Sequence, residues 1–231
     1  MKYFEPLGLL LLMLCGVARP ILAQTADERA GARTEQAGFW GVVQGFDPRL
    51  KWLLFSDILI RFCERIPYAW VVIYAMDHVG TSATQVGVLT AVEMLVAMAC
   101  FVPVAHLADR YGKEPFVIAT FVFFTLFPVT LYQAENFGML AAAFAVRGLK
   151  EFGDPARKAL VIGYSQPEAR GRAVGAYYLV RDVVVTSGSF LGAGLWKLGP
   201  GANFLGAAAL GAAGTVVYVA TRRRAVRQIS R

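Results

Sequence analysis

Charged residues are scarce in this chain of 231 residues. Asp, Glu, Lys and Arg together make up 17% of it and apolar residues 57%, whereas soluble globular domains have roughly 25% and roughly 45–50%. A disordered chain is excluded, because so much apolar surface can be buried. A soluble domain is excluded as well, because a chain of this length cannot bury nearly all of its residues in water. The composition predicts a membrane protein, and at about 20 residues per spanning helix the length has room for six or seven spans.

Cysteine and histidine are also rare. Cys15, Cys63 and Cys100 lie far apart inside apolar runs and outside any Cys-x-x-Cys pattern. We interpret them as small buried apolar residues and not as disulfide partners or metal ligands. The two histidines, His78 and His106, are expected at helix ends, so neither a metal site nor a cofactor is predicted. The sequence has no nucleophile–base pattern and no nucleotide-binding loop, so it gives no support for an enzyme.

Six long apolar segments follow a polar stretch. We expect residues 24–51 to form a cytoplasmic linker and residues 52–221 a bundle of six transmembrane helices, because backbone in lipid must satisfy its own hydrogen bonds. The separators between the segments are short, which predicts antiparallel neighbours. The predicted spans are residues 52–76, 84–105, 115–133, 138–164, 173–197 and 202–221. The predicted fold class is therefore an all-α polytopic membrane helix bundle.

Lysine and arginine are distributed unevenly over the predicted loops. Alternate loops and the C-terminal tail hold thirteen of them, and the other loops hold only Lys197. Because positive residues accumulate on the cytoplasmic side, we expect an inner-membrane protein with a basic cytoplasmic tail at residues 222–231. A basic run directly after an apolar span is typical of a membrane flank and not of a nucleic-acid-binding surface. The thirteen are Arg29, Arg33, Arg49, Lys51, Arg110, Lys113, Arg170, Arg172, Arg222, Arg223, Arg224, Arg227 and Arg231.

The first apolar run, from Pro6 to Ala18, is too short to span the bilayer well. Residues 1–23 are a partial span or the remnant of a preceding helix, a cleaved signal peptide, or an interfacial segment. A cleaved signal peptide would export residues 24–51 and invert everything after them. This conflicts with the distribution of positive charge, so we favour the first interpretation.

Charged residues occur inside four of the six predicted spans, although each costs about 2.5–3.5 kcal/mol at the bilayer centre on insertion scales. The third and sixth spans carry none. The order of charged and apolar spans thus repeats after three helices, as expected of two inverted three-helix repeats. We expect many of these charges to line a transport cavity, and a purely structural role is the alternative for about half of them. The candidates for the cavity and for proton coupling are Glu64, Arg65, Glu93, Arg147, Lys150, Glu151, Asp154, Arg181 and Asp182.

The spacing of these charges gives two further expectations. In the first span Asp57, Arg61, Glu64 and Arg65 share one helix face and sum to zero charge, so they can neutralise one another. A structural and a transport role are equally open for Asp57 and Arg61. The charges of the fourth span, from Arg147 to Lys158, also share one face.

Glu93 has no partner nearby in the sequence. We expect it either to pair across the bundle or to carry a proton, because burial favours the neutral form of a carboxyl. A carboxyl that gains and loses a proton inside the membrane is what a proton-coupled carrier needs. Arg157 and Lys158 lie near the predicted cytoplasmic end, and we expect their side chains to reach toward water.

The segment between the second and third spans is a recognisable motif. Residues 105–113, Ala-His-Leu-Ala-Asp-Arg-Tyr-Gly-Lys, resemble the major facilitator superfamily signature Gly-x-Leu-Ala-Asp-Arg-x-Gly-Arg/Lys, with Ala105 in place of the leading glycine. Arg147-Gly148 in the fourth span and residues 170–173 before the fifth carry a second resemblance to that family. The resemblance implies the C-terminal six-helix half of a twelve-helix transporter. The cytoplasmic gate that it implies consists of Leu107, Asp109, Arg110, Gly112 and Lys113.

The family resemblance also implies a function. In that family the first, second, fourth and fifth helices of a half line the cavity, which agrees with the charged spans here. We therefore expect a secondary transporter with alternating access for a polar or charged small solute, with proton coupling as an option. Antiport gains no support, because Gly192 is followed by Ala193 and not by proline.

A six-helix half alone would expose its charged face to lipid. The expected partners are therefore the bilayer, a small solute and a second six-helix half, either a copy of this chain or a separate one, and no nucleic acid is expected. Two alternatives stay open: a non-transporting assembly or regulatory subunit of the membrane, and an inactive truncated transporter.

Overall fold

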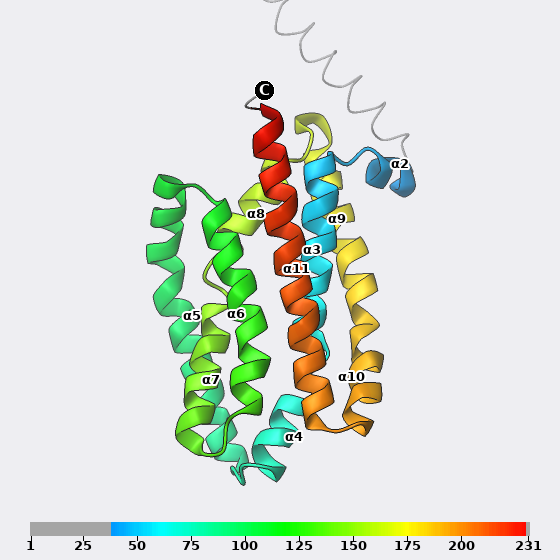
Figure 1. Ribbon diagram of the computed structural model, residues 1–231. Coiled ribbons are helices and arrows are strands. Elements are labelled where there is room, and N and C mark those ends of the chain that lie inside the picture. Colours follow the sequence, from blue (N-terminus) through cyan, green and yellow to red (C-terminus); the bar gives the residue numbers. More distant parts are fainter. Residues whose placement is uncertain (1–37, 230–231) are drawn as a thin grey trace, which may run out of the picture.

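The computed structural model describes residues 38–229, without the side chains of residues 102, 105 and 223–229. The first apolar run and residues 24–37 of the linker lie outside this range. The described chain is a helix bundle without strands (Figure 1), which confirms the predicted all-α membrane bundle. Its elements are α2 (Phe39–Gln44), α3 (Pro48–Arg65), α4 (Trp70–Asp77), α5 (Ala83–Tyr111), α6 (Glu114–Tyr132), α7 (Phe137–Leu149), α8 (Asp154–Gly163), the 3-10 helix η1 (Pro167–Ala169), α9 (Arg170–Thr186), α10 (Gly188–Lys197) and α11 (Pro200–Ile229).

Three of the predicted spans are single helices, and three are divided. By length and composition, α5, α6 and α11 can cross a membrane, through residues 83–101, 114–132 and 200–222. The first predicted span is divided into α3 and α4, the fourth into α7 and α8, and the fifth into α9 and α10. The expectation of six unbroken helices is therefore wrong at three points. The divided spans are the three with the most charged residues.

Local chemistry accounts for two of the breaks. Pro67 follows α3 and lacks the N–H that a continuing helix would use. Gly153 precedes α8, and Pro155 occupies the first turn of α8, where proline is tolerated. The third break is a single residue, Ser187, between α9 and α10.

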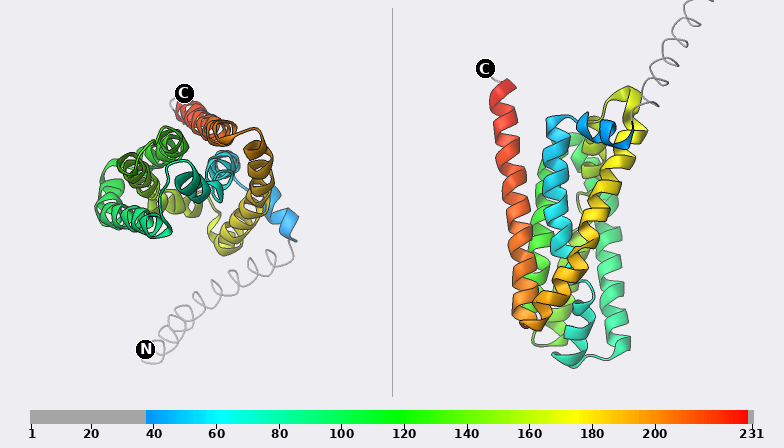
Figure 2. Two further views of the ribbon diagram at one scale, coloured as in Figure 1. Left: turned by 90° about the horizontal axis from the view of Figure 1, so that it is seen from below. Right: turned by 90° about the vertical axis from the view of Figure 1, so that its right-hand side faces the viewer.

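The linker is partly helical, contrary to the prediction of a loop at residues 24–51. Its last residues form α2 and the first turn of α3. Asp47 caps α3, because its Oδ1 accepts a hydrogen bond of 2.7 Å from the backbone N–H of Arg49. Figure 2 shows α2 at the end of the bundle, beside the start of α9.

The connections alternate between the two ends of the bundle as predicted. The α5–α6 and α8–α9 connections lie at the same end as α2 and the C-terminus, and residues 78–82, 133–136 and 198–199 lie at the opposite end (Figure 1). We call the first the basic end, because Arg110, Lys113 and Arg170 lie there. The assignment of this end to the cytoplasm stays a prediction.

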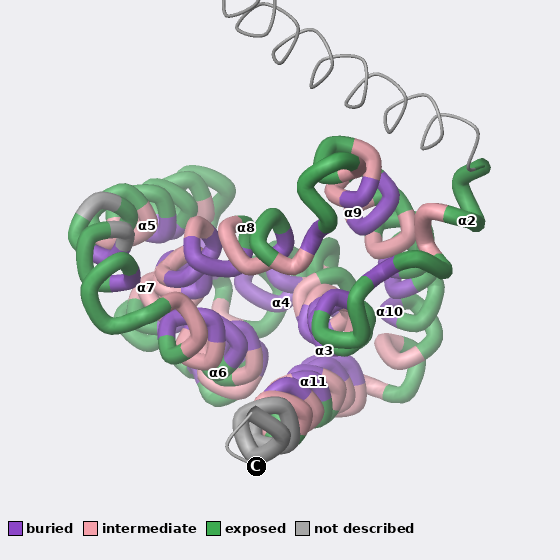
Figure 3. The backbone as a smooth tube through the Cα atoms, turned by 90° about the horizontal axis from the view of Figure 1, so that it is seen from above, coloured by how far each residue is buried: buried purple, intermediate pink, exposed green. Residues whose placement is uncertain are grey.

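Helix α3 lies in the middle of the bundle, in contact with α11, α9, α6 and α10 (Figure 2). Glycines allow this close packing. A Cβ at Gly214 of α11 would lie 3.0 Å from the carbonyl oxygen of Ser56, and a Cβ at Gly192 of α10 would collide with the carbonyl of Ile66. Figure 3 shows buried residues toward the middle of the bundle, whereas α5 is largely exposed on its outer side.

Two apolar clusters divide the core along the bundle axis. One includes Leu53, Phe121 and Phe124 and extends to the basic end, and the other includes Phe127 and Phe144 and extends to the opposite end. Charged side chains lie between them. The guanidinium of Arg61 lies 5.2 Å from the ring centre of Phe124, and that of Arg147 lies 5.2 Å from the ring centre of Phe127. The candidate site is thus enclosed by aromatic rings from both clusters.

Candidate functional site

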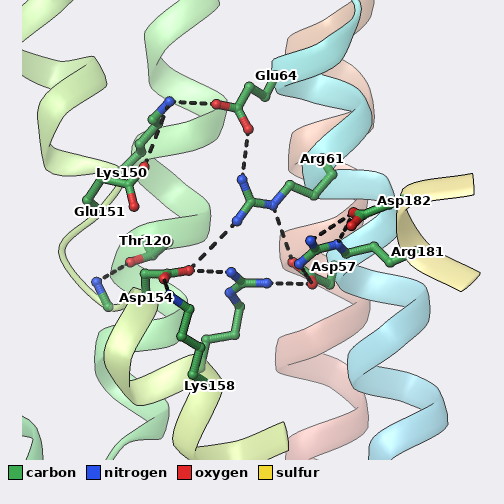
Figure 4. Close-up of polar contacts among 12 residues, drawn as sticks. Asp57, Arg61, Glu64, Thr120, Lys150, Glu151, Asp154, Lys158, Arg181 and Asp182 are labelled. Carbon is green, nitrogen blue, oxygen red and sulfur yellow. Dashed lines mark hydrogen bonds and ion pairs between the residues drawn. The ribbon is translucent and has the colours of Figure 1, made fainter. Parts of the chain in front are cut away.

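Charged side chains from α3, α5, α7, α8, α9 and the turn between α7 and α8 form one connected set of ion pairs, which we call the charge network. Figure 4 shows the part of it around Asp57, Arg61 and Asp154. The charge network contains six acidic and six basic side chains, so its net charge is zero when all are ionised. Its members are Asp57, Arg61, Glu64, Glu93, Arg147, Lys150, Glu151, Asp154, Arg157, Lys158, Arg181 and Asp182.

Asp57 joins three helices through one carboxylate, and it is only 1% exposed. Its Oδ2 accepts hydrogen bonds of 2.6 Å from Arg157, 3.3 Å from Arg181 and 3.1 Å from the hydroxyl of Tyr177. These donors come from α8 and α9. Removal of this one charge would therefore affect α3, α8 and α9 together.

Arg157 lies between two acids, because its other guanidinium nitrogen donates to Asp154. It is 2% exposed, so the expectation that it reaches toward water is wrong. Its partners explain the difference, because Asp57 and Asp154 hold its guanidinium inside the bundle. Lys158 does extend outward, with 58% of its side chain exposed and its Nζ 2.8 Å from Asp154.

Lys150 joins the two halves of the charge network. Its Nζ lies 2.5 Å from Glu64 on α3 and 3.6 Å from Glu93 on α5. The other partner of Glu93 is Arg147, at 3.3 Å. Glu93 is 4% exposed. Of the two expectations for Glu93, the structure shows the first, an ion pair across the bundle. Gly148 permits the approach, because a Cβ there would lie 2.5 Å from the carbonyl oxygen of Glu93.

Residues 150–153 form a turn that the sequence did not indicate. The backbone N–H of Gly153 donates a hydrogen bond of 2.6 Å to Oγ1 of Thr120 on α6 (Figure 4), and a Cβ at Gly153 would collide with the backbone of Phe116. The turn thus packs against α6, and this contact fixes the position of Lys150 and of the start of α8. Thr120 and Tyr177 could not be predicted from the sequence, because both are uncharged and only charged residues inside spans gave a signal.

Three candidates lie at the border of the charge network or outside it. The side chains of Glu151 and Asp182 are 38% and 62% exposed, and each pairs with a single base. Arg65 is exposed and makes no ion pair with any described residue; its guanidinium lies 5.6 Å from the ring centre of Tyr68. Of the four charges of the first span, Asp57, Arg61 and Glu64 pair with one another and with residues of other helices, and only Arg65 stays outside these pairs.

The implied gate residues lie at the basic end. Residues 106–111, expected in a loop, continue α5, and only Gly112 and Lys113 separate α5 from α6. Gly112 has φ +88°, a conformation that favours glycine. Leu107, Asp109 and Arg110 are exposed, and Asp109 has no ion pair within the described part of the chain. Their role as a gate stays a prediction.

Known proteins share this sequence pattern. A family model described as "Major Facilitator Superfamily" matches residues 53–231. The chain belongs to the major facilitator superfamily. This superfamily member is 28% identical over 149 residues to the "Multidrug resistance protein MdtH" of Yersinia pestis (strain Pestoides F) and to that of Yersinia pseudotuberculosis serotype O:1b (strain IP 31758). Each match covers 63% of this chain and 36% of the relative's length.

Proposed function

We propose that the chain is one six-helix half of a secondary transporter that works by alternating access. The observation that carries this proposal is the charge network, which several divided helices surround. In transporters with repeated halves, substrate and coupling-ion sites lie near the bilayer midplane and are formed by discontinuous helices. Ionisable residues inside spans are expensive, and by default they mark a transport pathway.

The pairing within the charge network suits a bundle that moves. Arg61 lies within 4.0 Å of Asp57, Glu64 and Asp154, and Lys150 has three acids within 3.9 Å. A base with several acids in reach can exchange one partner for another when helices shift. No charge is then left buried alone, which would cost about 3–5 kcal/mol. A purely structural ion pair needs only one partner.

Glu93 is our candidate for proton coupling. Its two bases lie at the start of the α7–α8 break, Arg147 in the last turn of α7 and Lys150 in the break itself, and Lys150 is shared with Glu64. Protonation of Glu93 would release both bases toward other partners. The ion pairs that join α5 to the α7–α8 break would thus depend on whether Glu93 is protonated.

A second six-helix unit is our proposed partner. Asp182 and Lys158 lie inside predicted spans and are 62% and 58% exposed at the side chain, so lipid contact would be costly for them. Exposed charge of both signs suits a polar or charged solute in a cavity shared by two halves. In the same arrangement Asp109 and Arg110 would contact the second unit as the cytoplasmic gate.

Proteoliposomes test the transport proposal. The full chain, alone and with any membrane protein that co-purifies with it, is reconstituted with a pH gradient and a panel of anionic, cationic and neutral small solutes. We expect flux of at least one solute, its loss in Glu93→Gln, and its retention in Glu135→Gln, a matched change at an exposed acid outside the predicted spans. Absence of flux for every solute, with stable co-purification of a membrane protein of another class, would favour an assembly or regulatory subunit.

A further inference from the structure

The charge network leaves one interior charge without compensation. Two charged residues inside the predicted spans make no ion pair with a described residue. One is Lys197 at the end of its span, and the other is Arg65, near the middle. Its neighbour Glu64 does not neutralise it, because that carboxylate pairs with Arg61 at 2.9 Å and with Lys150 at 2.5 Å. The twelve paired charges sum to zero, so the interior of this half carries one excess positive charge at Arg65.

Arg65 lies where two divided helices meet. It is the last residue of α3, and a Cβ at Gly188, the first residue of α10, would lie 3.3 Å from the Cβ of Arg65. The breaks at Ile66–Ala69 and at Ser187 are therefore neighbours in space. Both fall near the middle of their predicted spans, and discontinuous helices at that depth form solute sites in transporters with this architecture.

Lipid headgroups do not suit an arginine at this position. The hydrocarbon core is about 30 Å thick, so the headgroups lie about 15 Å from its middle, farther than one arginine side chain reaches. A permanent ion pair with a second half does not suit it either, because two halves that rock about a midplane site would have to break that pair in every cycle. A solute that enters and leaves avoids this cost.

We infer that Arg65 binds a negatively charged group, such as a carboxylate, sulfonate or phosphate, on the transported solute. The inference rests on the proposed transport function and narrows it to anionic solutes. Tyr68, 55% exposed, holds the guanidinium against its ring and leaves the guanidinium donors available for two parallel hydrogen bonds to such a group.

Two dyes that share a xanthene scaffold and differ in charge test the inference. Binding of anionic fluorescein and cationic rhodamine 123 to the full chain is measured by fluorescence anisotropy in phosphatidylcholine nanodiscs. We expect the chain to prefer fluorescein, Arg65→Gln to weaken its binding about tenfold or more, and Arg65→Lys to retain part of it. Lys197→Gln removes an exposed positive charge at the opposite end and should leave binding unchanged.

Each other outcome overturns the inference. Preference for rhodamine 123, binding of neither dye, or equal binding by the chain and by Arg65→Gln would show that Arg65 is not an anion site. Displacement of fluorescein by added phosphatidylglycerol would assign the site to a lipid headgroup, and loss of dye binding on assembly with a second half would assign it to a carboxylate of that partner. The flux assay separates the two proposals: flux without an Arg65-dependent preference leaves transport standing, and Arg65-dependent binding without flux leaves only the anion site.

Discussion

Replacement of Asp57 by asparagine should destabilise the bundle more than any change at the exposed border of the charge network. The variant keeps the size of the side chain and removes the charge that Arg157, Arg181 and Tyr177 contact. Arg157, 2% exposed, would retain only Asp154. Breaking a buried ion pair by removal of one partner costs about 3–5 kcal/mol. We expect a loss near the lower limit, because Asp154 continues to compensate Arg157.

Asp182→Asn is the matched control. Its side chain is 62% exposed and pairs with Arg181 alone, so its loss should cost about 0–1 kcal/mol. Unfolding of the purified chain in mild detergent, driven by added dodecyl sulfate and followed by circular dichroism, gives both free energies of unfolding. In the double variant of Asp57→Asn with Arg157→Gln, the loss should be smaller than the sum of the single losses. Equal stability of Asp57→Asn and Asp182→Asn would refute the assignment of Asp57 as the residue that joins three helices.

Two further predictions concern backbone contacts. Gly192→Ala should lower the free energy of unfolding by about 1–3 kcal/mol because its Cβ collides with the carbonyl of Ile66, while Gly194→Ala, with open space around its Cβ, should stabilise the helix slightly. Equal melting temperatures of these two variants would contradict the close contact of α10 with α3. Thr120→Val should cost about 1–3 kcal/mol by leaving the buried N–H of Gly153 without its acceptor, and Thr120→Ser should restore most of the loss; a Val variant as stable as the Ser variant would contradict this role.

The fold was largely predictable because a bilayer restricts the choice of backbone structure. Apolar length and polar separators predict helices and connections that alternate between two ends, and the structure has this arrangement. The breaks were harder to predict. Pro67 and Gly153 are visible in the sequence, but proline also occurs inside unbroken α5 and α6, at Pro103 and Pro128. Prolines and glycines are tolerated inside spans where neighbouring groups satisfy the freed backbone, and at the α7–α8 break Thr120 accepts the N–H of Gly153.

The sequence indicated which charged residues lie inside the spans, and the structure adds how they pair. Charge inside an apolar span is a strong signal, and it selected most members of the charge network. Helical spacing within one segment suggested local pairs, and the structure has them, as between Arg157 and Asp154, but close contacts also run between segments, such as Lys150 with Glu64 and Arg157 with Asp57. Spacing describes one helix, whereas pairing depends on how helices are rotated against one another. Arg157, for example, lies inside the bundle because both Asp57 and Asp154 pair with it.

The position of the breaks and the position of the charges explain each other. A charged side chain inside a span needs partners on several sides, and one straight helix presents only a narrow face to each neighbour. The turn at residues 150–153 lets one segment present Arg147 and Lys150 to α5 and, after the turn, Arg157 to α3. The same turn rests on α6 through one hydrogen bond of Gly153. A shift of this turn would therefore change the pairing of α3 and of α5 together.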